Sequence, residues 1–275
     1  MSLRRPAVAG QFYPGNELQA RAELEKAFLS PLGPGELPNV ASKGERSIVG
    51  AVVPHAGWMY SGAVAAHVYS ALARDGLPEA FIVLGPNHHG AGAPVAMSTQ
   101  DFTTPLGTAT IDEDLAAKLG KLVADDASSH RSEHSIEVQL PFLQYLGGDI
   151  KFVPISMTAQ NPQAAAELAR DMKGAIAGRD VVVLASTDMS HYVPPEVARK
   201  QDAEVIEQIL AMNALGVYEA VVRRNVTMCG YGPVMAMMLA CGGGKAELLK
   251  YATSGDVSPM NEVVGYAGIV VRKQA

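Results

Sequence analysis

Two hydrophobic patterns recur in turn along the chain. Short uninterrupted apolar runs predict buried strands at residues 47–53, 81–84, 151–155, 181–185, 248–252 and 263–271, with a shorter strand at 95–97. Apolar residues at helical spacing predict helices at residues 17–28, 62–74, 112–123, 133–146, 161–177, 195–212, 215–223 and 234–241. Asp112 and Asn161 are expected to cap two of these helices, and Pro141 must kink one or begin a turn of it.

Strands alternate with helices almost throughout, which predicts an α/β fold. We expect three layers, α/β/α, around a mainly parallel, mixed central sheet. Residues 5–15 are rich in glycine and proline and are predicted to form an irregular arm anchored by Phe12 and Tyr13. Residues 34–46 and 125–132 are expected to be polar loops. Because no linker, repeat or low-complexity run interrupts the pattern, residues 1–275 are predicted to form a single domain.

Composition narrows the class of protein. Hydrophobic residues make up 48% of the chain, which is enough for a full core, and charged residues only 18%, below the usual share of about 25%. The net charge of −6, with basic residues adjacent only in isolated pairs, argues against binding nucleic acid. The chain contains no apolar run of the length, about 18 residues, that spans a membrane, and no apolar segment typical of a signal peptide. We therefore predict a cytoplasmic location and no membrane partner.

Three predicted strands end in turns that carry metal-binding or acid/base side chains. His55 follows the strand at 47–53, His88 and His89 follow the strand at 81–84, and Asp188 and His191 follow the strand at 181–185. Parallel strands present their carboxyl ends at one edge of a sheet, where ligands bind in open α/β folds. Imidazole is a common metal ligand, so these turns predict a metal or catalytic site.

The turn residues also have structural interpretations. His55 could simply cap its strand, and Asp188 could do no more than hold backbone amides of its turn. His89 is the residue of the His88–His89 pair with the weaker case for a direct role. His134, which follows Glu133 at a predicted helix start, could serve equally in capping, in an ion pair or in catalysis.

The two cysteines and the aromatic residues near the turns are ambiguous as well. Two cysteines cannot form a disulfide framework, and a lone cysteine such as Cys229 is often only a small hydrophobic residue. Cys241 lies in the apolar run MAMMLAC, so we expect it to be buried and unreactive. Trp58, Tyr60 and Tyr192 flank the turns and could form the walls of a pocket or pack in the core.

Six separated segments in one order resemble the Memo family, which is similar in fold to the class III extradiol dioxygenases, non-haem iron(II) enzymes. The resemblance extends from about residue 5 to residue 271, and the segments are RPAVAGQFYPG, PHAGWMYSGAVAAHVY, VLGPNHHG, EHSIEVQLPFLQY, STDMSHY and MCGYGP. Because six separate motifs match in the same order, the resemblance is more specific than one that rests on a single His-His pair. The family's animal members are described as bridging receptor tyrosine kinase signalling, and its prokaryotic members often occur beside a radical-SAM enzyme.

The resemblance implies a metal pocket formed by His55, His88 and Cys229. Asp188 and His191 would line this pocket, with His191 at the position of the dioxygenases' acid/base histidine. We also expect the pocket to be lined by His89, Trp58, Tyr60, Glu133, His134 and Tyr192. Where the dioxygenases use a carboxylate as the third ligand, this chain has a thiol, and a thiolate favours softer metals. We expect iron(II) first, with copper or zinc as alternatives, and a metal that purification can remove.

Three functions are consistent with these residues. The first is a metal- and O₂-dependent oxidoreductase of the dioxygenase type, in which His191 moves protons. The second is metal-assisted hydrolysis, with Asp188 or His191 as the base for a bound water. The third is a non-catalytic protein with a vestigial site that binds a peptide or a metal. The expected partner is a small molecule or peptide in the pocket, with a functional link to a radical-SAM enzyme implied by the resemblance.

Overall fold

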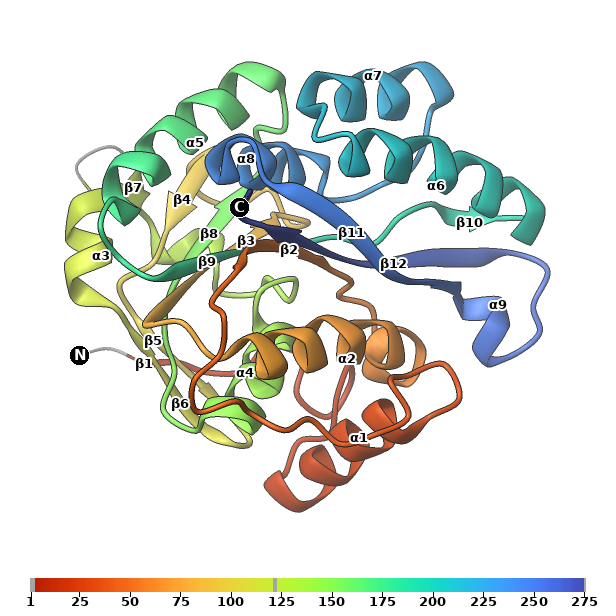
Figure 1. The fold of residues 1–275 in the computed structure, drawn as a ribbon, viewed down its shortest axis with the longest axis horizontal. Helices are drawn as coiled ribbons and strands as arrows, with labels where there is room; N and C mark the ends of the chain where they lie inside the picture. The colour runs from red at the N-terminus through yellow and green to blue at the C-terminus, as the bar shows by residue number, and fades with distance from the viewer. Residues whose placement is uncertain (1–2, 121–122, 275) are drawn as a thin grey trace.

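The computed structural model describes residues 3–120 and 123–274 and shows a mixed sheet covered by helices on both faces (Figure 1). The predicted α/β class is confirmed. The strands are β1 Leu3–Arg4, β2 Ile48–Val53, β3 Ala80–Pro86, β4 Val95–Met97, β5 Asp101–Thr104, β6 Gly107–Ile111, β7 Ala124–Asp125, β8 Lys151–Met157, β9 Val181–Ser186, β10 His191–Val193, β11 Lys245–Thr253 and β12 Val263–Arg272. The α-helices are α1 Glu17–Leu29, α2 Trp58–Asp75, α3 Glu113–Leu119, α4 Leu140–Gly147, α5 Pro162–Ile176, α6 Pro195–Leu210, α7 Ala214–Arg224, α8 Tyr231–Cys241 and α9 Ser254–Val257. Two 3₁₀ turns, η1 Ala127–Ser129 and η2 Glu137–Gln139, complete the described elements.

The centre of the sheet is parallel. Its strand order is β1-β5-β6-β8-β3-β9-β2-β12-β10, and neighbouring strands from β8 to β2 all run in the same direction. β12 pairs antiparallel with β2, and β10 and β11 pair antiparallel with β12. The parallel strands are the uninterrupted apolar runs of the sequence, because a strand covered on both faces must be apolar on both faces. Their carboxyl ends therefore share one edge.

Helices cover the two faces in separate groups (Figure 1). α2 packs on one face against β2, β11 and β12, with α1 and α4 beside it. α8 packs on the opposite face against β2, β3 and β9, and α5 and α7 flank it. α8 is apolar all round because it lies between the sheet and these two helices.

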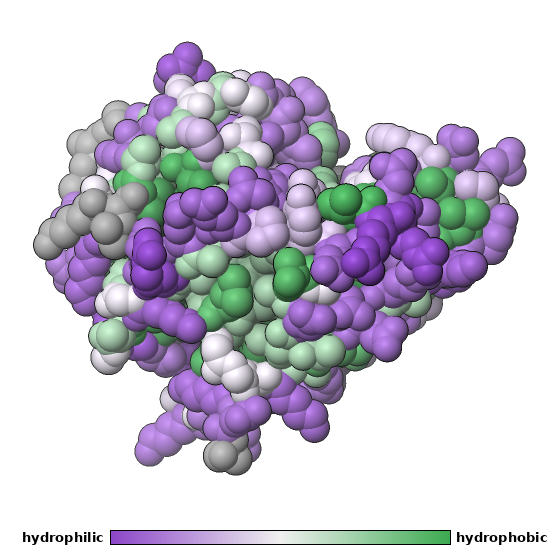
Figure 2. All heavy atoms as spheres, turned by 90° about the horizontal axis from the view of Figure 1, so that it is seen from above, coloured by the Kyte–Doolittle hydropathy of each residue, from purple (hydrophilic) through white to green (hydrophobic). Residues whose placement is uncertain are grey.

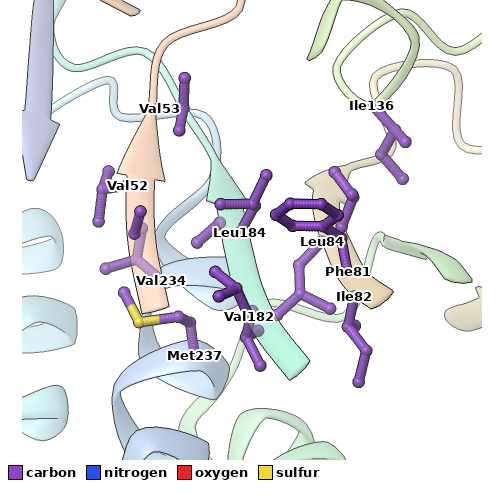
Figure 3. Packing of buried hydrophobic residues seen from close by; sticks show 14 of the residues in the cluster. Val52, Val53, Phe81, Ile82, Leu84, Ile136, Val182, Leu184, Val234 and Met237 are labelled. Atoms are coloured by element: carbon purple, nitrogen blue, oxygen red, sulfur yellow. The ribbon is translucent and has the colours of Figure 1, made fainter. Parts of the chain in front are cut away.

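The core between α8 and the sheet is shown in Figure 3. Val234 and Met237 of α8 approach Val52 of β2, and all three side chains are fully buried. Burying side chains of this size stabilises the fold by roughly 1.5–3 kcal/mol each. This packing fixes the ends of β2, β3 and β9 relative to one another, and so fixes the turns that follow them.

The prediction of one helix over residues 133–146 is wrong. Only η2 and α4 are helical in this segment, and Pro141 lies in the first turn of α4, where proline is tolerated. The carboxylate of Glu133 accepts the backbone N–H groups of His134 and Ser135, each at 2.8 Å. These local bonds compete with helical ones and hold residues 133–136 in a turn.

Several other boundaries differ from the predictions. α2 begins at Trp58 and not near residue 62, and α3 ends at Leu119, before Gly120; residues 121–122 of the predicted helix lie outside the described residues. The predicted loop at 125–132 contains the end of β7 and η1, which the side chain of Asp126 caps. The β5–β6 hairpin and β10 lack a strong apolar run, so their strand character was not predicted.

In the part of the chain that is described, none of the helices is both long and apolar enough to cross a bilayer. Figure 2 shows one face of the molecule, on which hydrophilic residues are distributed among small hydrophobic groups. Such scattered apolar groups are normal for a protein surface.

Candidate metal centre

The turns after β2 and β3 bring His55 and His88 together with Cys229, which lies just before α8. The ligand atoms of His55, His88 and Cys229 all lie within 4.8 Å of one another. β9 separates β2 from β3 in the sheet, so the two histidines reach over the end of β9 from either side. The expected convergence of these three side chains is therefore observed.

The Cys229 sulfur is held close to His55. Its Sγ lies 3.2 Å from His55 Nε2 and accepts the backbone N–H of Asp188, also at 3.2 Å. Cys229 is two residues before the first residue of α8, and the positive end of a helix favours a thiolate. Without a metal, burial and the nearby charge of Asp188 raise the pKa of the Cys229 thiol. A bound cation would remove this penalty, because metal binding deprotonates a thiol outright.

His88 is oriented by a buried carboxylate. Its Nδ1 lies 2.9 Å from Glu133 Oε1, and its backbone N–H donates to Glu133 Oε2 at 2.6 Å. A carboxylate only accepts, so Nδ1 carries the proton and Nε2 is left with a free lone pair. This is the arrangement that commonly orients metal-binding histidines.

A second group, His88, Glu133 and His134, also has the spacing of a metal site. Its carboxylate, however, already accepts four N–H groups: those of His88 Nδ1 and of the backbone of His88, His134 and Ser135. We therefore assign Glu133 the role of orienting His88. Sequence analysis placed Glu133 in the pocket but could not show which side chain it binds.

The surroundings shift the pKa values of the cluster's histidines in different directions. Burial, together with the neighbouring His134 and His88, lowers the pKa of His55 well below its usual value, so His55 is neutral. Burial also lowers the pKa of His134, to about 4. Burial acts in the same direction on His88, but the hydrogen bond and charge of Glu133 outweigh it and raise its pKa. Neutral imidazole is the form that binds a metal.

Asp188 and His191 lie beside the cluster, outside the three-residue group. Asp188 Oδ1 accepts the backbone N–H groups of His55 at 2.8 Å and Ala56 at 3.3 Å, so it holds the turn after β2. Burial raises the pKa of Asp188 to about 6, although these amides oppose the shift. His191 Nδ1 lies 2.8 Å from the Thr227 carbonyl, which only accepts, so neutral His191 presents an unprotonated Nε2.

A cavity of about 520 Å³ opens onto this cluster. It is within the usual size range of small-molecule sites, roughly 300–1,000 Å³. Of the predicted site residues, those that line it are His55, His88, His134, Asp188, His191, Tyr60 and Tyr192. Tyr192 is strongly exposed and has a left-handed backbone conformation, with φ of 56°, which is uncommon for an aromatic residue.

Glu133, which orients His88, does not line the cavity, and two further residues predicted to lie in the pocket are elsewhere. Trp58 is buried between Tyr13 and Phe142, with ring centroids at 4.9 and 5.2 Å, and is not among the described residues that line the cavity. His89 is exposed, and its backbone N–H donates to Asn87 Oδ1 at 3.1 Å. Neither therefore contacts a ligand in this cavity directly.

Sequence analysis missed several residues that line the cavity. Phe12, expected only to anchor the arm, lies beside His134 with ring centroids at 4.6 Å. Five more come from the segment around α9 and β12: Ser254, Met260, Glu262, Val264 and Tyr266. Phe12 lies in the segment RPAVAGQFYPG, which could have indicated its role. The residues around α9 and β12 lie in none of the six segments, so no motif in the sequence pointed to them.

Cys241, by contrast, lies at the end of α8, away from the cluster. We expected it to be buried, but it is only partly buried. Its Sγ lies 3.7 Å from Met237 Sδ, and burial raises the pKa of the thiol to about 12. Because the thiolate is the reactive form, Cys241 in a Cys229→Ser variant should react with a maleimide at least about 10-fold more slowly in native than in urea-unfolded protein. Equal rates would contradict its predicted low reactivity.

Taken together, these features define an α/β protein whose sheet edge carries a His–His–Cys group able to hold a metal ion. The donor set fits a transition metal, because it combines a sulfur with imidazole nitrogens and one of the imidazoles has its proton held on the opposite nitrogen by a carboxylate. A model of the family described as Memo-like protein matches residues 4–270. The chain belongs to this family.

Relatives of similar length support the assignment. A MEMO1 family protein of Methanopyrus kandleri is 47% identical, covering 98% of this chain and 99% of the relative. A MEMO1 family protein of Methanosarcina acetivorans is 46% identical, covering 98% of this chain and all of the relative. A solved structure, of an uncharacterized protein from Escherichia coli K12, has 14% identity and a TM-score of 0.51 over 81% of this chain and 99% of that chain. That likeness concerns the fold alone.

Proposed function

We propose that this protein binds a transition metal through His55, His88 and Cys229 and is an oxidoreductase of the dioxygenase type acting on a small ligand in the cavity. The main support is the convergence of three soft or borderline ligand atoms within 4.8 Å, two of them on histidines that line a cavity of about 520 Å³. Iron(II) is the first candidate, with copper and zinc as alternatives favoured by the sulfur ligand. A redox-active metal would supply electron transfer between the substrate and O₂.

In this proposal Asp188 and His191 handle protons. The unprotonated Nε2 of His191 can accept a proton from a hydroxyl of the ligand, since the Thr227 carbonyl keeps the ring proton on Nδ1. The Asp188 carboxyl, with a pKa of about 6, can hold or release a proton near neutral pH. The aromatic residues Phe12, Tyr60 and Tyr266 give the cavity apolar walls suited to an aromatic ring.

Metal analysis followed by oxygen exposure tests the proposal. The protein is purified without chelators, its metal content is measured, and the metal-free form is titrated anaerobically with iron(II), copper(I) and zinc. Oxygen uptake that requires both the metal and a catechol would support an oxidoreductase. Tight binding without oxygen uptake would favour a binding protein, and metal-dependent ester hydrolysis would favour a hydrolase. Failure to bind any of the three metals would refute the metal site.

The roles of the histidines can be separated by substitution. His55→Ala should weaken metal binding by about 10-fold or more, because it removes one of three ligands. His191→Ala should keep the affinity within a few-fold and impair only turnover, because His191 lies outside the ligand group. Isothermal titration of both variants against wild type checks this. Equal losses of affinity would mean that His191 is itself a ligand.

A further inference from the structure

A buried chain of polar groups stands behind His55, on the side away from Cys229. It consists of Ser186 at the end of β9, Gln139 in η2 and the Ser135 carbonyl. The side chains of Ser186, Gln139 and His55 itself are at most 2% exposed. Its hydrogen-bond directions can be deduced from the backbone carbonyls at its ends, since a carbonyl can only accept.

The Gln139 amide has a single consistent orientation. Its nitrogen lies 2.9 Å from the Pro54 carbonyl, so this atom must be the donor and the amide oxygen faces the other way. That oxygen accepts the hydroxyl of Tyr69 at 2.7 Å. The second hydrogen of the amide is directed to Ser186 Oγ at 2.8 Å, so Ser186 accepts there.

The Ser186 hydroxyl then has its own proton accounted for. Ser186 Oγ lies 2.6 Å from the Ser135 carbonyl, to which it must donate. With its only hydrogen used in this bond, Ser186 Oγ can act only as an acceptor towards His55 Nδ1, which lies 2.9 Å away. The proton of neutral His55 is therefore on Nδ1, and Nε2, 3.2 Å from the Cys229 sulfur, carries a free lone pair.

We infer that Ser186 is a positioning residue that fixes the tautomer of His55, with its polarity set by the Ser135 carbonyl and the Gln139 amide. His88 obtains the same tautomer from the charged Glu133, whereas His55 obtains it from neutral groups. A neutral partner suits this place, because Asp188 is already buried against the backbone of His55 and a second buried carboxylate would be costly. The effect of this tautomer on metal binding rests on the proposed function, whereas the tautomer of His55 follows from the hydrogen bonds alone.

Long-range ¹H–¹⁵N correlation spectra of metal-free protein with ¹⁵N-labelled histidine test the inference. Wild type should show His55 with its proton on Nδ1. In Ser186→Ala, Nδ1 loses its acceptor, so the proton should move to Nε2 and face Cys229. Ser156→Ala is the matched control: Ser156 is also fully buried on a neighbouring part of the sheet, and its hydroxyl has no hydrogen-bond partner in the structure. This control should leave the tautomer unchanged.

Metal titration of the same proteins gives the second readout. Ser186→Ala should bind zinc about 10–100-fold more weakly than wild type, the range typical of lost outer-sphere partners, whereas Ser156→Ala should bind as wild type. A wild-type His55 with its proton on Nε2 would overturn the inference even if Ser186→Ala did not fold, as would a Ser186→Ala protein that keeps the Nδ1 proton. If the tautomer moves as expected but no form binds metal, the inference stands and the proposed function fails.

Discussion

Replacing Glu137 by glutamine should lower the free energy of unfolding by about 3–5 kcal/mol, the usual cost of breaking a buried ion pair. Glu137 is fully buried and pairs with the equally buried Arg4. Its two oxygens also accept the backbone N–H groups of Ala7 at 2.7 Å and Val8 at 3.1 Å, and the hydroxyl of Tyr13 at 2.7 Å. One carboxylate thus binds Arg4 of β1 and three donors of the N-terminal arm.

A glutamine cannot replace this carboxylate, because its NH₂ group would face donors and leave Arg4 as an unpaired buried charge. Urea unfolding of the variant measures the loss. Tyr13→Phe removes a single donor and should cost only about 1.5 kcal/mol. The single variant Arg4→Met and the double variant Arg4→Met/Glu137→Gln complete a double-mutant cycle. The double variant has no buried charge without a partner, so its loss of stability should be smaller than the sum of the losses of Arg4→Met and Glu137→Gln by about 1 kcal/mol or more. Strictly additive losses would contradict the pairing.

The arm also lines the cavity through Phe12. Detachment of the arm can be observed through the fluorescence of Trp58. Trp58 is the only tryptophan of the chain and stacks on Tyr13 of the arm, with ring centroids at 4.9 Å. In Glu137→Gln the fluorescence of Trp58 should shift to longer wavelength before the main unfolding transition. A single transition with the wild-type emission would mean that the arm stays attached without the carboxylate.

His130 should make the protein less stable as the pH falls from about 6.5 to about 4. It is buried, its Nε2–H donates to the Ala96 carbonyl at 3.1 Å, and its ring lies against Phe102. Burial lowers its pKa from 6.5 to about 4. In this window the unfolded chain binds a proton that the folded protein does not, so protonation favours unfolding.

The expected size follows from about 1.4 kcal/mol per pH unit, which gives about 3 kcal/mol by pH 4. His130→Gln keeps a side-chain N–H donor but has no titrating group. Unfolding by urea is measured for both metal-free proteins at pH 7 and pH 4. The free energy of wild type relative to the variant should fall by about 3 kcal/mol between the two pH values. An unchanged difference would show that His130 does not contribute to acid sensitivity.

The apolar runs of the parallel strands were predicted well, because strands covered on both faces are apolar throughout. The convergence of His55 and His88 followed from the same argument, since the carboxyl ends of parallel strands lie at one edge. The β5–β6 hairpin could not be predicted in this way, because its residues alternate between buried and exposed. The strand at 263–271 was predicted, but its place in the wall of the cavity was not, because that place depends on segments distant in sequence.

The segment EHSIEVQ separates what the sequence determined from what only the tertiary structure decided. From the sequence alone, Glu133 and His134 of this segment were predicted to lie in the same pocket as His55 and His88. It contains two glutamates four residues apart, and nothing local distinguishes them. In the folded chain Glu133 orients His88 and Glu137 fixes the N-terminal arm. Their partners lie 45 and 130 residues away, so each role arises only when the packed sheet brings those distant donors to a buried carboxylate.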